Sequence, residues 1–424
     1  MGNPLFPGLR DWIAWQRRSH LHTPKRRLSP TIYLDFLWFG RNPQMDLLNM
    51  AGQLEEAERQ RLREISQVAQ REVRRQSIGY WNREEFPAEL IGKLAELGLG
   101  GLQLEDSSHL LRGLIHAELA RADISTSSVV GIHNELVLGM IHELGSEQQR
   151  ARWQDKLAGF EAFGAFALTE PEHGSDIAGG IGATAHRGGD EYVINGAKRW
   201  IGMGTLSDFA LVWAKDEGTA QIGAYLVESD RPGYSATKIE NKIGLRGMQN
   251  ADIRLENVRI PVANKLPGAT SFAAANQLLM QSRAWVGWQA AGAIMATLDI
   301  CKAYATQRQQ FGKPLAAFQL IQQPLAEIAG NLGACLSMMC EIARKQERGK
   351  LRMEDAAMAK STATRLARES AALGRAMLGG NGVVSDFEMA KVFCDVEILH
   401  TYEGTYEINS LIVGRALTGV SAFV

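Results

Sequence analysis

The sequence predicts a mostly α-helical protein of the α+β class, with a helical domain, a small antiparallel β-barrel or sandwich, and a helical bundle in that order. Two changes of hydrophobic period predict it. Apolar residues recur every three or four positions over residues 46–160, alternate over 161–275, and recur helically again over 276–424. At 424 residues the chain is also too long for one ordinary core.

Residues 1–44 differ in composition from the rest of the chain. They hold seven Lys and Arg against two Asp, which is typical of a mitochondrial transit peptide, a disordered arm, or sequence upstream of a start at Met45. We favour the last two, because the prolines from Pro4 to Pro30 would break an amphipathic targeting helix. The expected location is the bacterial cytoplasm, or the mitochondrial matrix if this leader is a transit peptide.

The two helical parts each show one apolar face. In the first, the spacing of Leu48, Leu62 and Ile65 fits helices, and "ELIGKLAELGLGGL" repeats the period until its glycines. In the bundle, one face of a helix that ends at Gly379-Gly380 carries Ala363, Leu366, Ser370, Leu373 and Met377.

The middle of the chain has the pattern of strands. "EYVINGAKRW" places Asn195-Gly196 between two alternating runs, which predicts a tight hairpin turn at that pair. The runs "FALVWA", "IGAYLV" and "ADIRLENVRIP" predict further short strands. We therefore expect a small antiparallel unit between the two helical parts.

Composition limits the classes of partner. Apolar residues make up 45% of the chain, charged residues 22%, and the formal net charge is −1, so we expect no nucleic-acid partner. The longest apolar run, residues 284–298, contains Gln289, which favours a buried helix over stable membrane insertion. The four cysteines form no C-x-x-C pair and are expected to be buried free thiols.

Several common chemical motifs are excluded. The glycine-rich runs 179–185 and 379–384 follow a polar loop and a helix rather than a strand, so neither is typical of a dinucleotide site. His142 lacks a second histidine four residues on, and His133 is nine residues away, so we expect no metal site.

Three clusters remain as candidates. They are "FALTEPEHGSD" (166–176) with "RWIG" (199–202), "RQQFGKPLAAFQ" (308–319), and the segment from "LGGNG" to "TYEGT". Each alone has an ordinary explanation as a loop, a core ring, a solvated charge or a helix C-cap. Glu403 lies between apolar runs, and a buried carboxylate needs a compensating interaction. A salt-bridged glutamate and a reactive base both stay open on these residues alone.

Together the clusters resemble one family, the acyl-CoA dehydrogenase and acyl-CoA oxidase superfamily. The resemblance covers residues 46–423 and includes "ALTEPEHGSD" and the run from "GGNG" to "YEGT". "NKIGLRGMQN" and "TYEGTYEINSLIVGRALTGVSAF" are most similar to the branch that holds glutaryl-CoA dehydrogenases and plant short-chain acyl-CoA oxidases. The family fold implied is a helical domain, an antiparallel β-barrel and a C-terminal four-helix bundle, assembled as a homotetramer or homodimer.

The resemblance implies a chemistry for Glu403, which matches the carboxylate of the family's Y-E-G-T segment. In that chemistry the base removes the α proton of an acyl-CoA, while the β hydride passes to flavin N5 of FAD. A backbone N–H directed at the thioester oxygen would stabilise the developing enolate. Desolvation would raise the pKa of Glu403 toward that of the activated substrate.

Further roles are implied residue by residue. Arg308, Phe311, Gln319 and the segment 376–380 match positions that reach the FAD of a neighbouring subunit. The residues expected to bind FAD are Phe166, Leu168, Thr169, Gly174, Ser175, Trp200, Ile201, Gly202, Arg308, Phe311, Gln319, Ala376, Met377, Leu378, Gly379, Gly380, Thr405, Glu407 and Phe423. The residues expected to contact the acyl-CoA are Ser127, Ser128, Ser175, Arg283, Tyr402 and Gly404.

Three departures from the family pattern bear on the substrate. Ser127 stands where glutaryl-CoA dehydrogenases carry an arginine for the distal carboxylate, which disfavours glutaryl-CoA. Gly202 replaces a threonine that many dehydrogenases have, and the plant oxidases share that glycine. "GLQLEDSSHLLRG" lacks the longer loop usual after the first helices, which changes the expected shape of the acyl pocket.

The first hypothesis is therefore an FAD-dependent dehydrogenase of short, uncharged acyl-CoAs that gives electrons to an electron-transfer flavoprotein. The alternatives are an acyl-CoA oxidase, a glutaryl-CoA dehydrogenase-like enzyme with an altered substrate, and a flavin-binding paralogue with a structural or nucleic-acid-protecting role. The intact Glu403 and the missing basic field disfavour the last.

Deleting residues 1–44 is expected to leave FAD content and turnover unchanged, because the resemblance begins after them and their composition offers no packed face. Flavin absorbance and turnover of a protein beginning at Met45, beside the full chain, would measure this. A shortened protein that lost its flavin would contradict the expectation.

Overall fold

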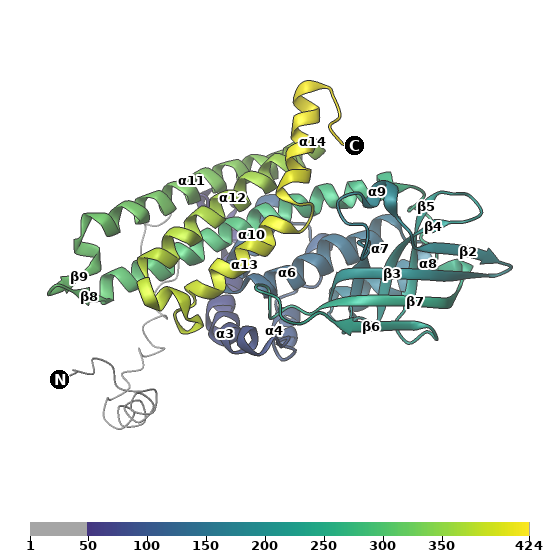
Figure 1. The fold of residues 1–424 in the computed structure, drawn as a ribbon, viewed down its shortest axis with the longest axis horizontal. Coiled ribbons are helices and arrows are strands. Elements are labelled where there is room, and N and C mark those ends of the chain that lie inside the picture. Colours follow the sequence, from purple (N-terminus) through teal and green to yellow (C-terminus); the bar gives the residue numbers. More distant parts are fainter. Residues whose placement is uncertain (1–48, 424) are drawn as a thin grey trace, which may run out of the picture. The chain divides into compact units, whose positions relative to one another are not determined.

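A computed structural model describes residues 49–423, so the leader lies outside the described residues. Helices, then a sheet, then longer helices follow one another along the chain, and the predicted fold class is confirmed (Figure 1). The N-terminal helical elements are η2 (Ala51–Gln53), α2 (Glu56–Val68), η3 (Ala69–Val73), α3 (Arg74–Arg83), α4 (Leu90–Glu96), η4 (Leu102–Leu104), α5 (His109–Ala122), α6 (Ile124–Gly131), η5 (Ile132–Leu138), α7 (Gly139–Leu144) and α8 (Glu147–Ala158).

The central unit is a seven-stranded sheet in the order β1-β4-β2-β3-β7-β6, with β5 also paired to β4. Its elements are β1 (Gly164–Ala167), α9 (Ile177–Gly180), β2 (Thr184–Gly188), β3 (Glu191–Gly202), β4 (Phe209–Asp216), β5 (Ile222–Glu228), β6 (Tyr234–Lys238), β7 (Asn250–Pro261) and η6 (Val262–Asn264). The sheet is mixed rather than purely antiparallel, because β4 runs parallel to β1 and to β2. Both parallel partners reach β4 by long connections, as parallel pairing requires.

The predicted hairpin turn at Asn195-Gly196 is wrong. β3 continues through both residues, and the chain turns from β2 into β3 at Gly189-Asp190. The pairing of β3 with β7 shifts register at Gly196, whose φ is 146° and where a Cβ would approach the Cβ of Ala183 to 2.7 Å. The Asn-Gly pair therefore belongs to a β-bulge, which demands the same backbone freedom as a tight turn.

The C-terminal part is a helical bundle of α10 to α13, with α14 packed on α12. Its elements are α10 (Phe272–Gln307), β8 (Gln309–Gln310), β9 (Lys313–Pro314), η7 (Leu315–Ala317), α11 (Gln319–Glu347), α12 (Met353–Met377), η8 (Gly379–Val383), η9 (Ser385–Phe387), α13 (Met389–Thr401) and α14 (Tyr406–Thr418). In residues 49–423, α11 alone is long and apolar enough to cross a membrane by length and composition. It packs against α10 and α12, and a core helix passes the same test. Cys301 and Cys335 are buried free thiols, as expected, Cys340 is buried, and Cys394 is half-buried.

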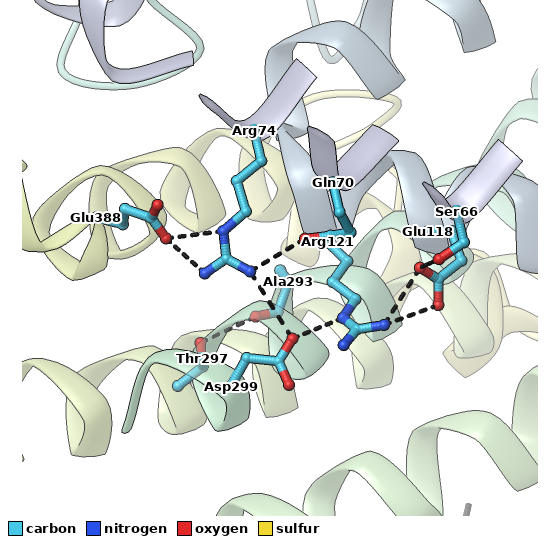
Figure 2. Close-up of polar contacts among 9 residues, drawn as sticks. All are labelled: Ser66, Gln70, Arg74, Glu118, Arg121, Ala293, Thr297, Asp299 and Glu388. Atoms are coloured by element: carbon cyan, nitrogen blue, oxygen red, sulfur yellow. Dashed lines mark hydrogen bonds and ion pairs between the residues drawn. The ribbon is translucent and has the colours of Figure 1, made fainter. Parts of the chain in front are cut away.

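A buried ionic network joins the N-terminal helices to the bundle (Figure 2). Arg121 on α5 donates to Asp299 on α10 at 2.6 Å and to Glu118 at 3.2 Å. Arg74 on α3 donates to Glu388 at 2.5 Å and lies 3.9 Å from Asp299. Burial alone would lower the pKa of Arg121, yet Asp299 and Glu118 raise it above its ordinary value. The network therefore keeps alternating charges paired between α3, α5, α10 and the residue that precedes α13.

Arg121→Met should lower the free energy of unfolding by about 3–5 kcal/mol, because it removes a partner from the buried Glu118 and from the half-buried Asp299. The urea midpoint of the flavin-loaded protein measures the loss. Arg365→Met is the matched control: its ion pair with Glu369, within α12, is about half exposed and is worth about 0–1 kcal/mol. Equal midpoints for the two variants would contradict a stabilising role for the network.

Candidate active site

Glu403 lies in the short turn between α13 and α14. Its φ is 55° and that of Gly404 is 82°, so two successive left-handed residues reverse the chain. Thr405 then caps α14 by accepting a hydrogen bond from the N–H of Ile408 at 3.2 Å. The turn directs the Glu403 carboxylate toward α10, where the buried Ser282 hydroxyl donates to it at 2.6 Å.

The surroundings of this carboxylate change its acidity. Burial raises the pKa of Glu403, although the Ser282 hydrogen bond and the charges of Arg283 and Lys360 act in the opposite direction. The net result is a carboxyl group with a pKa above its ordinary value, as a base for a weakly acidic carbon requires.

Lys360 on α12 is the second charged group at the turn. Its side chain is fully buried, and its ammonium donates to the carbonyl of His400 at 2.9 Å and to the carbonyl of Gly404 at 2.8 Å. Burial lowers the pKa of Lys360 to about 7, while Glu403 raises it and Arg283 lowers it further. Lys360 therefore forms hydrogen bonds to the backbone before and after Glu403.

Tyr402 anchors the other side of the turn. Its hydroxyl donates to Gln289 Oε1 on α10 and lies 3.4 Å from the Ser128 hydroxyl on α6. Gln289 in turn donates to Ser128 at 3.1 Å, and the Trp285 ring meets the Tyr402 ring edge-on with centroids 6.0 Å apart. Ser127 does not join this set, because its hydroxyl donates to the His116 carbonyl at 3.1 Å.

The loop after β1 is fixed by a buried ion pair. Lys198 on β3 is fully buried and donates to the Leu168 carbonyl at 2.9 Å and to Glu170 at 2.7 Å. Glu170 accepts from the N–H groups of Gly182 and Ala183. Burial lowers the pKa of Lys198 to about 8, although Glu170 raises it. The expected flavin-contacting residues of this loop grade from the buried Leu168 through the half-buried Phe166 and Thr169 to the exposed Gly174 and Ser175.

Trp200, near the end of β3, presents an aromatic ring to solvent. Its side chain is 53% exposed, its φ is 65°, and the guanidinium of Arg199 lies 4.8 Å from the ring centroid. The following Ile201 and Gly202 are buried. An exposed ring held by a left-handed backbone beside a fixed loop fits the planar ring system of a flavin.

The end of β3 and the Glu403 turn contact the same helical segment. A Cβ on Gly202 would lie 2.7 Å from Ile132 Cδ1, and Ile132 is one helical turn beyond Ser128, which contacts Tyr402. The structure therefore brings the β3 residues, Tyr402, Glu403 and Gly404 to one junction between sheet and bundle. Arg283 reaches this junction too, since a Cβ on Gly404 would lie 3.5 Å from its Nη2.

A second group of expected FAD residues lies elsewhere. Arg308 and Phe311 belong to the exposed connection from α10 to α11, and Phe311 is 92% exposed. Gln319, also exposed, is the first residue of α11. The α12 end joins this region, because Tyr304 on α10 bonds the Leu378 carbonyl and accepts from Asn381. Figure 1 shows β8 and β9 at the end of the bundle opposite the sheet. Around them Ala376, Gly379 and Gly380 are exposed, whereas Leu378 is buried and Met377 half-buried.

The expected residues at the C-terminal end are outward-facing. Glu407, on the first turn of α14, is exposed, and its own backbone N–H and Thr405 lower its pKa. Phe423 is 42% exposed. Neither side chain approaches Glu403 through a hydrogen bond or ion pair among the described residues.

The sequence interpretation missed Lys360, Lys198, Ser282 and Gln289. Two of them carried a signal in the hydrophobic pattern. Lys360 falls on the buried alanine face of α12, and Lys198 falls at an inward-facing position of β3. A lysine at an apolar position of a regular element is expected to have buried partners.

Comparison with known proteins agrees with this arrangement. The models of the acyl-CoA dehydrogenase N-terminal, middle and C-terminal domains match residues 55–161, 165–258 and 272–418. The mitochondrial short-chain specific acyl-CoA dehydrogenase of Mus musculus is 34% identical over 343 residues, which are 78% of this chain and 83% of the mouse protein. A subunit of the caffeyl-CoA reductase–Etf complex of Acetobacterium woodii is 32% identical over 78% of this chain and 90% of its own.

A solved structure agrees as well. A glutaryl-CoA dehydrogenase from Mycobacterium smegmatis in complex with FADH2 superposes with a TM-score of 0.86 at 32% identity, covering 90% of this chain and 99% of its own. The matches span nearly all the described residues and include a flavin-bound relative. The chain therefore belongs to the acyl-CoA dehydrogenase family, as an FAD-dependent oxidoreductase that dehydrogenates acyl-CoAs.

Proposed function

We propose that Glu403 is the base that removes the α proton of a short, uncharged acyl-CoA, giving the trans-2-enoyl-CoA. The observation that carries this proposal is the Glu403 carboxylate, held by Ser282 at 2.6 Å and raised in pKa by burial, at the junction of sheet and bundle. The α C–H bond breaks and its proton goes to Glu403, while the bonding pair becomes part of the new double bond. When bound, the flavin supplies the acceptor for the β hydride.

The protein groups around Glu403 suit this proton transfer. Among the described residues the backbone N–H of Glu403 makes no hydrogen bond within the protein, so it can serve as a donor beside the base. A donor aimed at the thioester oxygen stabilises the enolate as negative charge develops there. The turn itself is fixed by Thr405, Lys360 and Tyr402, so little reorganisation accompanies the reaction.

Two observations support a short and uncharged acyl chain. Ser127 and Ser128, at the positions expected near the distal end of the acyl group, are fully buried, and their hydroxyls donate to the carbonyls of His116 and Ile124. A terminal carboxylate there would lack a cationic partner and would be costly to bury. The mouse relative is named as short-chain specific. A glutaryl-CoA dehydrogenase-like activity is therefore the less favoured substrate assignment.

The electron acceptor is proposed to be an electron-transfer flavoprotein. Support comes from the relative in the caffeyl-CoA reductase–Etf complex. An acyl-CoA oxidase activity is the alternative, favoured by Gly202, which the plant oxidases share by resemblance. Oxygen uptake with excess butyryl-CoA separates the two: slow uptake beside fast anaerobic flavin bleaching supports the dehydrogenase, and uptake at the bleaching rate supports the oxidase.

We also propose that the enzyme acts as a homotetramer or homodimer, located in the bacterial cytoplasm. The elements that carry the two groups of FAD residues lie at opposite ends of the bundle: the sheet with β3, which holds Trp200, at one end, and β8 and β9, which adjoin Arg308 and Phe311, at the other (Figure 1). One FAD cannot contact both groups within one chain. A second copy that brings its Arg308 to the sheet end of the first would complete both sites, and the fully exposed Phe311 ring would then be covered.

Glu403→Gln is expected to slow flavin reduction by butyryl-CoA by at least about 10²- to 10⁴-fold, because glutamine keeps the shape of the side chain but cannot accept the proton. FAD content and acyl-CoA binding should persist, since those contacts do not use the carboxylate. Anaerobic stopped-flow absorbance of the flavin measures the rate. Reduction at the parental rate would mean that another group is the base. Glu407 would then be the next candidate, to be tested by Glu407→Gln.

Subunit mixing tests the shared site. One chain carries Glu403→Gln with intact Arg308, and the other carries Arg308→Ala with intact Glu403. If Arg308 serves the partner's flavin, each mixed pair contains one site with both residues intact, and co-expression should restore turnover that neither variant has alone. Mixed oligomers that stay as inactive as the two parents would show that both residues serve the same chain's site.

A further inference from the structure

The Glu403 turn is tied to α12 by one side chain. The Lys360 ammonium donates to the His400 carbonyl at 2.9 Å and to the Gly404 carbonyl at 2.8 Å. These carbonyls belong to the last turn of α13 and to the residue after Glu403, so the lysine spans the base. Asn409 also donates to the Gly404 carbonyl at 2.8 Å, and it is fully buried.

We propose that Lys360 is a positioning residue for the base, which holds Glu403 in its left-handed backbone conformation and places a positive charge beside its carboxylate. The proposal rests on the assignment of Glu403 as the base. A non-glycine residue at φ 55° is uncommon and persists only where its surroundings fix it. Two hydrogen bonds from one buried ammonium, placed on either side of that residue, supply such fixing.

Titratable groups from three further helices lie around Lys360 and Glu403. Arg283 comes from α10, His400 from α13, and Glu407 from the first turn of α14. Arg283 donates to the Leu279 carbonyl on α10 and to the sulfur of Met353 on α12, so its hydrogen bonds go to these helices rather than to the backbone of the turn. Lys360 therefore differs from Arg283: it acts on Glu403 through its charge and also forms hydrogen bonds to the backbone of the turn.

The charge of Lys360 shifts the pKa of Glu403 in a known direction. A charged Lys360 lowers the pKa of Glu403, so its removal should raise that pKa and move the acid limb of the pH profile to higher pH. Lys360 has a pKa of about 7, so this effect is present below about pH 7 and fades above it. Because the two groups interact, the limb reports the pair rather than either residue alone.

Two variants separate the backbone hydrogen bonds of Lys360 from its positive charge. Lys360→Met removes both and should slow flavin reduction by butyryl-CoA by about 10²-fold, the cost of a base displaced by about 1 Å. It should also move the acid limb upward, with little change in the concentration of acyl-CoA that half-saturates the reduction. Lys360→Gln keeps an amide N–H₂ donor without the charge, and it should recover much of the rate at pH 8 while keeping the upward shift of the limb.

The controls distinguish positioning from general stability. Lys345→Met removes the ion pair of Lys345 with Asp355 at the start of the same helix, and it should lower the melting temperature without moving the acid limb. FAD content and melting temperature are measured for each variant. In the Glu403→Gln background, Lys360→Met should slow reduction little further, because a residue that acts through the base has nothing left to position.

Each outcome decides the proposal. Parental rate and parental acid limb in Lys360→Met, with Glu403→Gln slow, would overturn the positioning role and leave the base assignment intact. Full additivity of the two substitutions would overturn it too, as would loss of soluble, flavin-loaded protein in both Lys360 variants, since the role would then be in folding. Parental reduction by Glu403→Gln alone would instead overturn the proposed function.

Discussion

The hydrogen bonds from the buried Lys360 ammonium to the carbonyls of His400 and Gly404 are the constraint on which the geometry of the site depends. A left-handed glutamate followed by a left-handed glycine is a strained way to leave a helix. Without those bonds the His400 carbonyl would lose its contact with α12, and the turn would depend on the Thr405 cap, the Tyr402 anchor and the hydrogen bonds from Asn409 and Ser282. With them, the carboxylate faces α10 before any substrate arrives.

A second buried lysine holds a loop in the same way at the other side of the site. Lys198 bonds the Leu168 carbonyl and Glu170, and so fixes the loop after β1 as Lys360 fixes the loop after α13. In both cases burial lowers the pKa of the lysine, to about 8 and about 7, and backbone carbonyls accept from the ammonium. A lysine suits this task because it offers three donors on a long stem and still titrates near neutrality. The two loops that flank the site are thus held by the regular elements behind them.

The order of helices, sheet and bundle follows from the hydrophobic period, and the sequence also singles out Glu403 as an oddly placed carboxylate. The parallel pairing of β4 with β1 and β2 does not follow, because the residues of a short buried strand are the same for either direction. The hairpin turn predicted at Asn195-Gly196 was wrong because a β-bulge and a tight turn require the same backbone freedom. Lys360 was overlooked although it falls on the apolar face of α12, because a lysine in an alanine-rich helix is usually solvated; its partners, the carbonyls of His400 and Gly404, follow only from tertiary packing.

If Glu403 is the base, as proposed above, charge balance explains how two cations can lie beside a group that accepts a proton. Arg283 and Lys360 stabilise the ionised Glu403, which by itself works against protonation. When the proton moves from substrate to carboxylate, however, the negative charge is not lost from the pocket, because it passes to the thioester oxygen of the substrate. The cations then act on that oxygen at a somewhat longer range, so their stabilisation is reduced rather than abolished. A proposed base whose pKa burial raises is therefore compatible with its buried, cationic setting.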